Sequence, residues 1–292
     1  MTNAITYLPG IADLVREYDG FVLDLWGVLH DGKSLYPGVA HTMGHLAAAG
    51  KSFVMLTNAP RRAWSVSEQL VAMGMPEVLS RPVVSSGEAT WRELLAWSDP
   101  WYADLGRRCY HIGPERDENL FDGLDIERVD VLENADIILN TGPWHDDERV
   151  ADYEGRLSTG AQRDLPMICV NPDLQVIRGG KRIICAGALG QRYEELGGKV
   201  RYLGKPHGSI YEYCFEHLSG VGRRRILAIG DSLHTDIAGA SAVGIDSVLV
   251  IGGIHAEELG VTNDATCGPH EIARLCAREG LSPVAAVPAF VW

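Results

Sequence analysis

The stretch FVLDLWGVLHDG (residues 21–32) indicates how the fold of this chain is built. Its first three residues are apolar strand formers, and they lead directly into the carboxylate Asp24, with the turn-forming Gly27 three residues later. This pattern predicts a buried strand that ends at Asp24. Ligands of open α/β sheets bind outside the carboxyl ends of the strands, so Asp24 is well placed for chemistry. The alternative interpretation is a carboxylate that only caps a turn.

The rest of the chain alternates predicted strands with predicted helices, which is typical of an α/β protein. Apolar spacing and turn residues predict helices over 11–18, 39–49, 88–96, 146–157, 187–196, 209–218, 237–243 and 269–278, with another that begins near 60. They predict further strands over 52–56, 83–87, 109–113, 129–132, 137–142, 167–173, 200–203, 225–229 and 246–250. We therefore expect a Rossmann-like, doubly wound parallel-sheet core formed by residues 1–80 and 201–292, with an inserted α/β cap domain over 81–200.

Polar side chains follow four of the predicted core strands. They are Asp24, Thr57, Asn58, Lys205, Asp231 and Asp236. Because the carboxyl ends of parallel strands meet at one edge of a sheet, we expect these side chains to lie close together.

The chemistry of this group points to a cation and a phosphate. The three aspartates would repel one another without a compensating cation, and hard oxygen ligands of this kind favour Mg²⁺. Lys205 adds a fixed positive charge, and Thr57 and Asn58 add neutral hydrogen-bond donors, a set suited to a phosphoryl group. An aspartate can itself attack phosphorus and form an aspartyl-phosphate.

Several of these residues also have a structural interpretation. Asp236 is placed to cap the helix that follows it, and Thr57 and Asn58 lie just before the helix predicted near residue 60. Trp26 can pack as an aromatic wall beneath the cap. In the cap itself, the polar segment 144–148 either faces the substrate or starts a solvated helix.

From Phe21 to Gly253 the motifs resemble those of the haloacid dehalogenase superfamily of hydrolases, class IIA, the NagD-like phosphatases with a large inserted cap. The most specific signal is GDSLHTD at 230–236 together with the upstream Lys205. The resemblance implies a Mg²⁺-dependent phosphatase that hydrolyses a small phosphorylated metabolite. Its implied metal ligands are Asp24, the backbone carbonyl of Trp26, Asp231 and Asp236. Its implied catalytic residues are the nucleophile Asp24 and the charge-neutralising Lys205, and its implied phosphate ligands are Thr57, Asn58 and Lys205.

One position departs from this family pattern. Phosphatases of the superfamily usually have a second aspartate two residues after the nucleophile, which acts as general acid, and here that residue is Trp26. Three accounts are open: a histidine (His30, His207 or His234, the last lying within the metal motif) protonates the leaving group; the substrate has a good leaving group; or the protein is a catalytically weak metal- and phosphate-binding regulatory protein. An aromatic residue at this position also resembles the true haloacid dehalogenases, although both aspartates of the fourth motif are kept here.

Composition and charge limit the partners. The formal net charge of −13 disfavours nucleic acid and anionic membranes, so we expect neither. The six cysteines are scattered and form no CxxC pair, which predicts buried free thiols. The sequence shows no secretory leader or membrane span, and we expect a cytoplasmic protein. By resemblance to the cap class we expect a homodimer.

Overall fold

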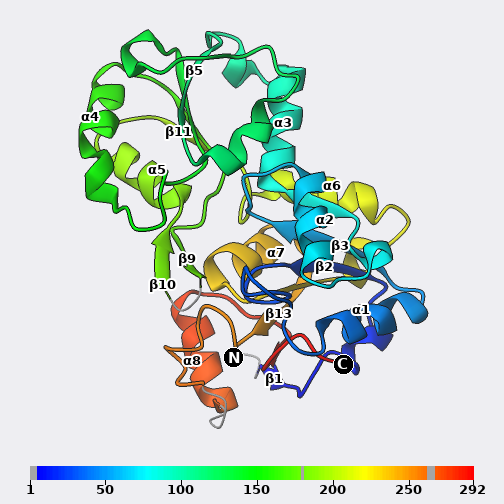
Figure 1. Ribbon diagram of the computed structural model, residues 1–292. Helices are drawn as coiled ribbons and strands as arrows, with labels where there is room; N and C mark the ends of the chain where they lie inside the picture. The colour runs from blue at the N-terminus through cyan, green and yellow to red at the C-terminus, as the bar shows by residue number, and fades with distance from the viewer. Residues whose placement is uncertain (1–4, 179–180, 262–266) are drawn as a thin grey trace. The chain divides into compact units, whose positions relative to one another are not determined.

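The computed structural model describes residues 5–178, 181–261 and 267–292, which form two compact units (Figure 1). Unit 1 consists of Met1–Thr57, Ser67–Val84 and Lys205–Trp292, and unit 2 consists of Asn58–Val66 and Ser85–Gly204. The sequence assigned residues 81–84 to the cap, and they lie in unit 1. It assigned residues 58–66 and 201–204 to the core, and they lie in unit 2.

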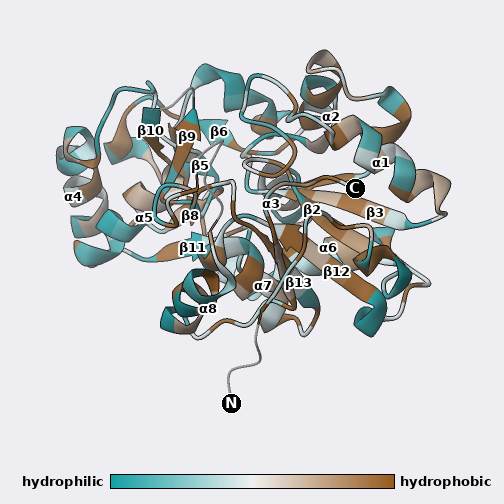
Figure 2. Ribbon diagram, turned by 90° about the horizontal axis from the view of Figure 1, so that it is seen from below, coloured by the Kyte–Doolittle hydropathy of each residue, from teal (hydrophilic) through white to brown (hydrophobic). Residues whose placement is uncertain are grey.

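Unit 1 contains a seven-stranded sheet in the order β1-β14-β13-β12-β2-β3-β4. The strands are β1 (Thr6–Tyr7), β2 (Gly20–Asp24), β3 (Ser52–Thr57), β4 (Val83–Ser85), β12 (Ile226–Gly230), β13 (Asp246–Val250) and β14 (Ala285–Val287). The pairings from β1 through β3 are all parallel. Strands β2 and β12 are buried along their whole length, as Figure 2 reflects in their apolar colouring. The predicted doubly wound parallel α/β fold is therefore confirmed.

Helices cover this sheet. They are α1 (Val39–Ala48), α2 (Ala63–Ala72), α6 (Gly208–His217), α7 (Ala238–Ala242) and α8 (Pro269–Arg278). Strand β2 pairs with β12 on one side and β3 on the other, and the chain proceeds outward from it in both directions. A sheet of this kind has its topological switch point at β2, and crevices for ligands form at the carboxyl ends of strands at such a point. Asp24 is the last residue of β2.

Unit 2 contains a five-stranded parallel sheet in the order β11-β8-β7-β5-β6 and a separate hairpin, β9-β10. Its strands are β5 (Arg108–Ile112), β6 (Glu127–Arg128), β7 (Ile137–Asn140), β8 (Met167–Cys169), β9 (Gln175–Arg178), β10 (Lys181–Ile184) and β11 (Val200–Tyr202). Its helices are α3 (Ser86–Ala96), α4 (Glu154–Gln162) and α5 (Ala186–Glu195). Successive residues of β7 pack on opposite faces of the unit 2 sheet. Ile138 packs with Leu157 and Tyr193, whereas Ile137 packs in a cluster with Leu94. Each face of this sheet therefore has its own apolar core.

Three predictions of secondary structure are wrong. Residues 11–18 form only a 3₁₀ turn, Leu14–Arg16, whose N–H groups bond to carbonyls three residues earlier. Ile11 and Val15 are buried without a full helix. The strand predicted at 129–132 ends earlier, at Arg128, and a turn starts at Leu132. The helix predicted from 146 begins at Glu154, after a 3₁₀ turn over Val150–Tyr153.

The strand before Lys205 is a fourth correction. The sequence placed it in the core sheet, but β11 pairs with β8 at the edge of the sheet of unit 2. Lys205 therefore does not end a strand of the core sheet. It lies in the connection between β11 and α6.

Two further expectations concern the whole chain. All six cysteines are free and buried, as predicted. Among the residues that the structure describes, no helix has both the length and the apolar character needed to cross a bilayer.

Candidate active site

Asp24 lies at the carboxyl end of β2 and is 6% exposed. The chain after it turns tightly, because the N–H groups of Leu29 and His30 both donate to the carbonyl of Leu25, at 2.8 and 3.0 Å. Gly27, in this turn, has a φ of +83°, a conformation that favours glycine. The turn predicted from the sequence is thus real, and it fixes the backbone directly after Asp24.

Asp231 follows β12, the strand beside β2, and it sits between two glycines. A Cβ atom on Gly27 would lie 2.0 Å from Oδ2 of Asp231, and one on Gly253 would lie 2.1 Å from the same oxygen. The backbone N–H of Ile254 donates to this oxygen at 2.7 Å. Gly253 and Ile254 were not among the residues predicted for the site, although a glycine pair two residues after the end of strand β13 is a signal for a close backbone approach.

Asp236 lies in a π-helical turn, Leu233–Ile237, that leads into α7. The N–H groups of Asp236 and Ile237 both donate to the carbonyl of Ser232, at 3.0 and 3.1 Å. Single π turns of this kind often occur at functional sites. The interpretation of Asp236 as the helix cap is wrong, because Ser232 fills that role: its hydroxyl accepts from the N–H of Thr235.

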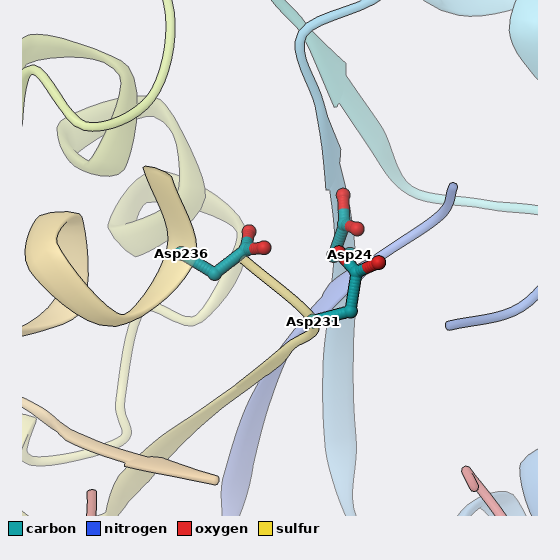
Figure 3. A group of neighbouring side chains, drawn as sticks. All are labelled: Asp24, Asp231 and Asp236. Carbon is teal, nitrogen blue, oxygen red and sulfur yellow. The ribbon is translucent and has the colours of Figure 1, made fainter. Parts of the chain in front are cut away.

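The three carboxylates converge, with oxygens that all lie within 4.8 Å of one another (Figure 3). We call this group, with Lys205, the acid cluster. The ammonium of Lys205 donates to Asp24 at 2.5 Å and to Asp236 at 2.6 Å, and it is almost fully buried. Burial, followed by repulsion from Asp236, raises the pKa of Asp24, and Lys205 only partly offsets this rise. One lysine therefore faces three buried carboxylates.

This donor set fits a hard divalent cation. Magnesium in proteins is bound through one or two carboxylates, water and substrate phosphate. Because Gly27 and Gly253 have no side chains, the Asp231 carboxylate occupies space that a Cβ atom at either position would fill. Asp24, Asp231 and Asp236 are the residues that would hold the ion, as the sequence predicted for these three.

The predicted phosphate ligands Thr57 and Asn58 are both buried. Thr57 is the last residue of β3, next to β2 in the sheet of unit 1. Asn58 belongs to unit 2, where its amide donates to Asp173 at 2.9 Å. Their binding of phosphate stays a prediction.

The indole of Trp26 packs over Gly32, where a Cβ atom would lie 2.3 Å from the ring, and it meets the ring of His30 edge-on. Nδ1 of His30 accepts the N–H of Gly32 at 3.0 Å. These contacts support a packing role for Trp26. The role of its backbone carbonyl as a metal ligand stays a prediction.

His207 and His234, two of the three histidines considered as general acids, are poorly suited to protonate a leaving group. His234 belongs to the GDSLHTD motif, but its side chain is exposed. Its Nδ1 lies 3.8 Å from a carboxylate oxygen of Glu279, near the end of α8. Burial lowers the pKa of His207, which disfavours its protonated form.

This chain is similar to known proteins in sequence and in fold. Residues 21–127 match the family described as haloacid dehalogenase-like hydrolase, and residues 202–274 match the one described as HAD-hydrolase-like. A haloacid dehalogenase-like family hydrolase from Brucella suis is 34% identical, with a TM-score of 0.83 over 97% of this chain and 100% of that chain. A 4-nitrophenylphosphatase from Thermotoga maritima is 25% identical, with a TM-score of 0.64 over 89% and 98%. Chronophin from Rattus norvegicus is 26% identical over 85% of this chain and 81% of its own.

Proposed function

The chain belongs to the haloacid dehalogenase-like hydrolase family, and on this premise we propose that it is a Mg²⁺-dependent phosphatase that hydrolyses a small phosphorylated metabolite. The acid cluster is the observation that carries the proposal. Three carboxylates within 4.8 Å and a lysine bonded to two of them suit a cation and a phosphoryl group held against one carboxylate.

The proposed reaction has two steps. An oxygen of Asp24 attacks phosphorus, a new P–O bond forms, and the ester P–O bond breaks with its electron pair on the departing oxygen. Water then attacks the phosphorus of the aspartyl-phosphate, which releases inorganic phosphate, regenerates the carboxylate and gives a proton to solvent. Lys205 holds Asp24 and balances negative charge in both steps. Mg²⁺, when bound, supplies positive charge at the phosphoryl oxygens.

Trp26 limits the range of leaving groups that the proposed phosphatase can release efficiently. An indole cannot protonate a leaving group, and general acid catalysis is typically worth roughly 10²–10⁴-fold. With His234 at the surface, we propose that the preferred substrates have leaving groups that depart as anions, such as aryl or acyl phosphates.

A panel of phosphate esters tests this proposal. Phosphate release is measured with Mg²⁺ for an aryl phosphate, an acyl phosphate and several sugar phosphates. We expect turnover of the activated compounds to exceed that of alkyl esters by roughly 10²-fold or more. Comparable turnover of an alkyl ester would mean that another group supplies the proton and would overturn the leaving-group proposal.

A second candidate function is a catalytically weak metal- and phosphate-binding regulatory protein, and the replacement of the usual acid by Trp26 is the observation that favours it. Mg²⁺ binding without turnover of any ester would support it over the phosphatase. Carbon–halogen hydrolysis is the weaker third candidate, and strict dependence of activity on Mg²⁺ would contradict it.

A further inference from the structure

Two neighbouring residues that follow strand β13, Ile254 and His255, contact the chain around two aspartates of the acid cluster, Asp231 and Asp236 (Figure 3). The N–H of Ile254 donates directly to the carboxylate of Asp231 at 2.7 Å. His255 bonds to Leu233, the first residue of the π-helical turn that contains Asp236. One short segment therefore reaches Asp231 directly and Asp236 through its turn.

The contact with Leu233 fixes where the neutral ring of His255 carries its proton. The backbone N–H of Leu233 donates to Nε2 of His255 at 3.3 Å. A ring nitrogen that accepts a hydrogen bond carries no proton, so the proton lies on Nδ1. Nδ1 lies 3.5 Å from a carboxylate oxygen of Glu258, whose other oxygen pairs with Arg278 at 2.7 Å. Burial also lowers the pKa of His255, which favours the neutral ring, although Glu258 opposes this effect.

The N–H of Leu233 depends on this acceptor. Leu233 begins the turn, so its N–H has no acceptor within the turn itself. Leu233 is fully buried and His255 is only 8% exposed, so bulk water has little access to the bond. Because a buried N–H without a partner is unfavourable, the ring of His255 holds the start of the turn in place.

The carboxylate of Asp236 is positioned by the same turn. It accepts the N–H of Ser232 at 3.1 Å and the ammonium of Lys205 at 2.6 Å. Leu233 lies between Ser232 and Asp236 in the sequence. A displacement of Leu233 would therefore move the carboxylate of Asp236 relative to the other members of the acid cluster.

We propose that His255 is a positioning residue for the acid cluster: its neutral ring holds the π-helical turn so that Asp236 joins Asp24 and Asp231 in binding one Mg²⁺ ion. The proposal rests on the Mg²⁺ site of the proposed function. Side chains that orient the ligands of a metal ion typically change its affinity when they are replaced. His255 acts through Leu233.

A matched pair of variants, H255Q and H255N, separates the bond to Leu233 from the packing of the ring. The oxygen of glutamine lies as many bonds from Cβ as Nε2 does, so H255Q keeps an acceptor for Leu233. The oxygen of asparagine lies as many bonds from Cβ as Nδ1 does, on the side of Glu258. The control H270N replaces an exposed histidine of α8.

Calorimetric titration with Mg²⁺ measures the effect on the ion without any turnover. We expect H255N to bind Mg²⁺ about tenfold more weakly than the wild type, and H255Q to stay within about twofold of it. H270N should bind like the wild type. Equal affinity in wild type and H255N, or an equal loss in H255Q and H255N, would overturn the proposal.

Magnetic resonance in EDTA tests the contact itself. In the wild type, nitrogen spectra should show Nε2 of His255 unprotonated and Nδ1 protonated at neutral pH. The amide hydrogen of Leu233 should exchange about tenfold faster in H255N than in wild type or H255Q. A proton on Nε2 in the wild type would overturn the proposal, and this measurement holds even if H255N fails to fold.

These readouts separate the proposal from the proposed function. Weakened Mg²⁺ binding by H255N, in a protein that hydrolyses no ester, would support the role of His255 and reject the phosphatase. Hydrolysis by the wild type, with H255N unchanged in Mg²⁺ affinity, would do the reverse. Absence of Mg²⁺ binding by the wild type would reject the Mg²⁺ site, and with it the role proposed for His255.

Discussion

The acid cluster of unit 1 and a second charged group in unit 2 hold buried charge in different ways. The second group consists of Arg61, Arg116, Asp117, Asp146 and Arg178, and we call it the arginine cluster. In the first, Lys205 donates to two of three buried carboxylates. In the second, Arg116 and Arg178 pair with Asp146, and the buried Asp117 lies within electrostatic reach of the arginines. Buried charge is costly unless it is paired, so the carboxylates of the acid cluster favour a bound cation, whereas the carboxylates of the second group already lie among arginines.

The two clusters differ in how the chain holds them. Asp24 and Asp231 extend from neighbouring parallel strands, and Asp236 follows in a turn only five residues after Asp231. The arginines are held by a 3₁₀ turn, the end of a hairpin strand and a connecting segment. A rigid sheet edge suits chemistry that needs fixed geometry, whereas loops suit recognition that varies among related proteins.

The largest effect should come from replacement of Lys205, whose ammonium group supplies the positive charge of the acid cluster. K205M leaves Asp24 and Asp236 buried without their shared partner, so we expect turnover to fall about 10³-fold or more. In EDTA, the free energy of unfolding should fall by about 3–5 kcal/mol, the usual cost of breaking a buried ion pair. Denaturant titration and phosphate release measure the two effects.

K51M is the matched control for this variant. Lys51 pairs with Asp19 at 2.9 Å in a more exposed setting, and its loss should cost no more than about 1 kcal/mol and leave turnover unchanged. Equal destabilisation by K205M and K51M would contradict the account of the acid cluster as a charge-dependent site.

The next effect tests whether the geometry of the acid cluster matters as much as its charge. G27A places a methyl group against Oδ2 of Asp231, and Gly27 also has a positive φ. We expect a loss of Mg²⁺-dependent turnover of roughly 10²-fold, as misplacement by about 1 Å can cause. Steady-state kinetics over a range of Mg²⁺ concentrations measure the effect.

G74A separates the clash from backbone strain, since Gly74 has a φ of +98° but open space around its Cβ position. This control should lose about 1 kcal/mol of stability and keep its activity. Full activity in G27A would show that Asp231 does not need its observed position.

The smallest effect concerns the carboxyl within the arginine cluster. Burial raises the pKa of Asp117 from 3.8 to about 6. The folded protein therefore binds more protons than the unfolded chain between about pH 4 and pH 6, and the stability contributed by this group is lost as pH rises through that range. D117N removes the titration. Relative to wild type, it should gain roughly 2 kcal/mol between pH 4 and pH 7.5. Chemical denaturation at several pH values checks this, and a pH-independent difference would contradict it.

The acid cluster could be predicted from the sequence because its carboxylates follow recognisable buried strands. Asp24 and Asp231 come at fixed points of an apolar pattern, and parallel strands bring such points to one edge. Lys205 was predicted with the right neighbours but for the wrong reason, since the strand before it belongs to the other sheet. The pairing of β11 with β8 is a long-range contact, and local sequence patterns do not encode such contacts.

The arginine cluster could not be predicted in the same way. Arg61 and Arg178 are 117 positions apart by their numbers, and no periodicity connects them. Gly113 had no signal either, because its role depends on Thr141 and His111 meeting in space. Strand β14, which lies between β1 and β13, and the hairpin β9-β10 were also missed, since short strands of this kind are defined by their partners rather than by their own residues.

The most direct test of the central claim is Mg²⁺-dependent phosphate release from 4-nitrophenyl phosphate by wild type and D24N. D24N keeps the size of the side chain but removes the nucleophile. We predict that wild-type turnover disappears in EDTA and returns with Mg²⁺, and that D24N shows at least about 10³-fold less turnover at every Mg²⁺ concentration. Turnover by D24N within tenfold of wild type would contradict catalysis through Asp24.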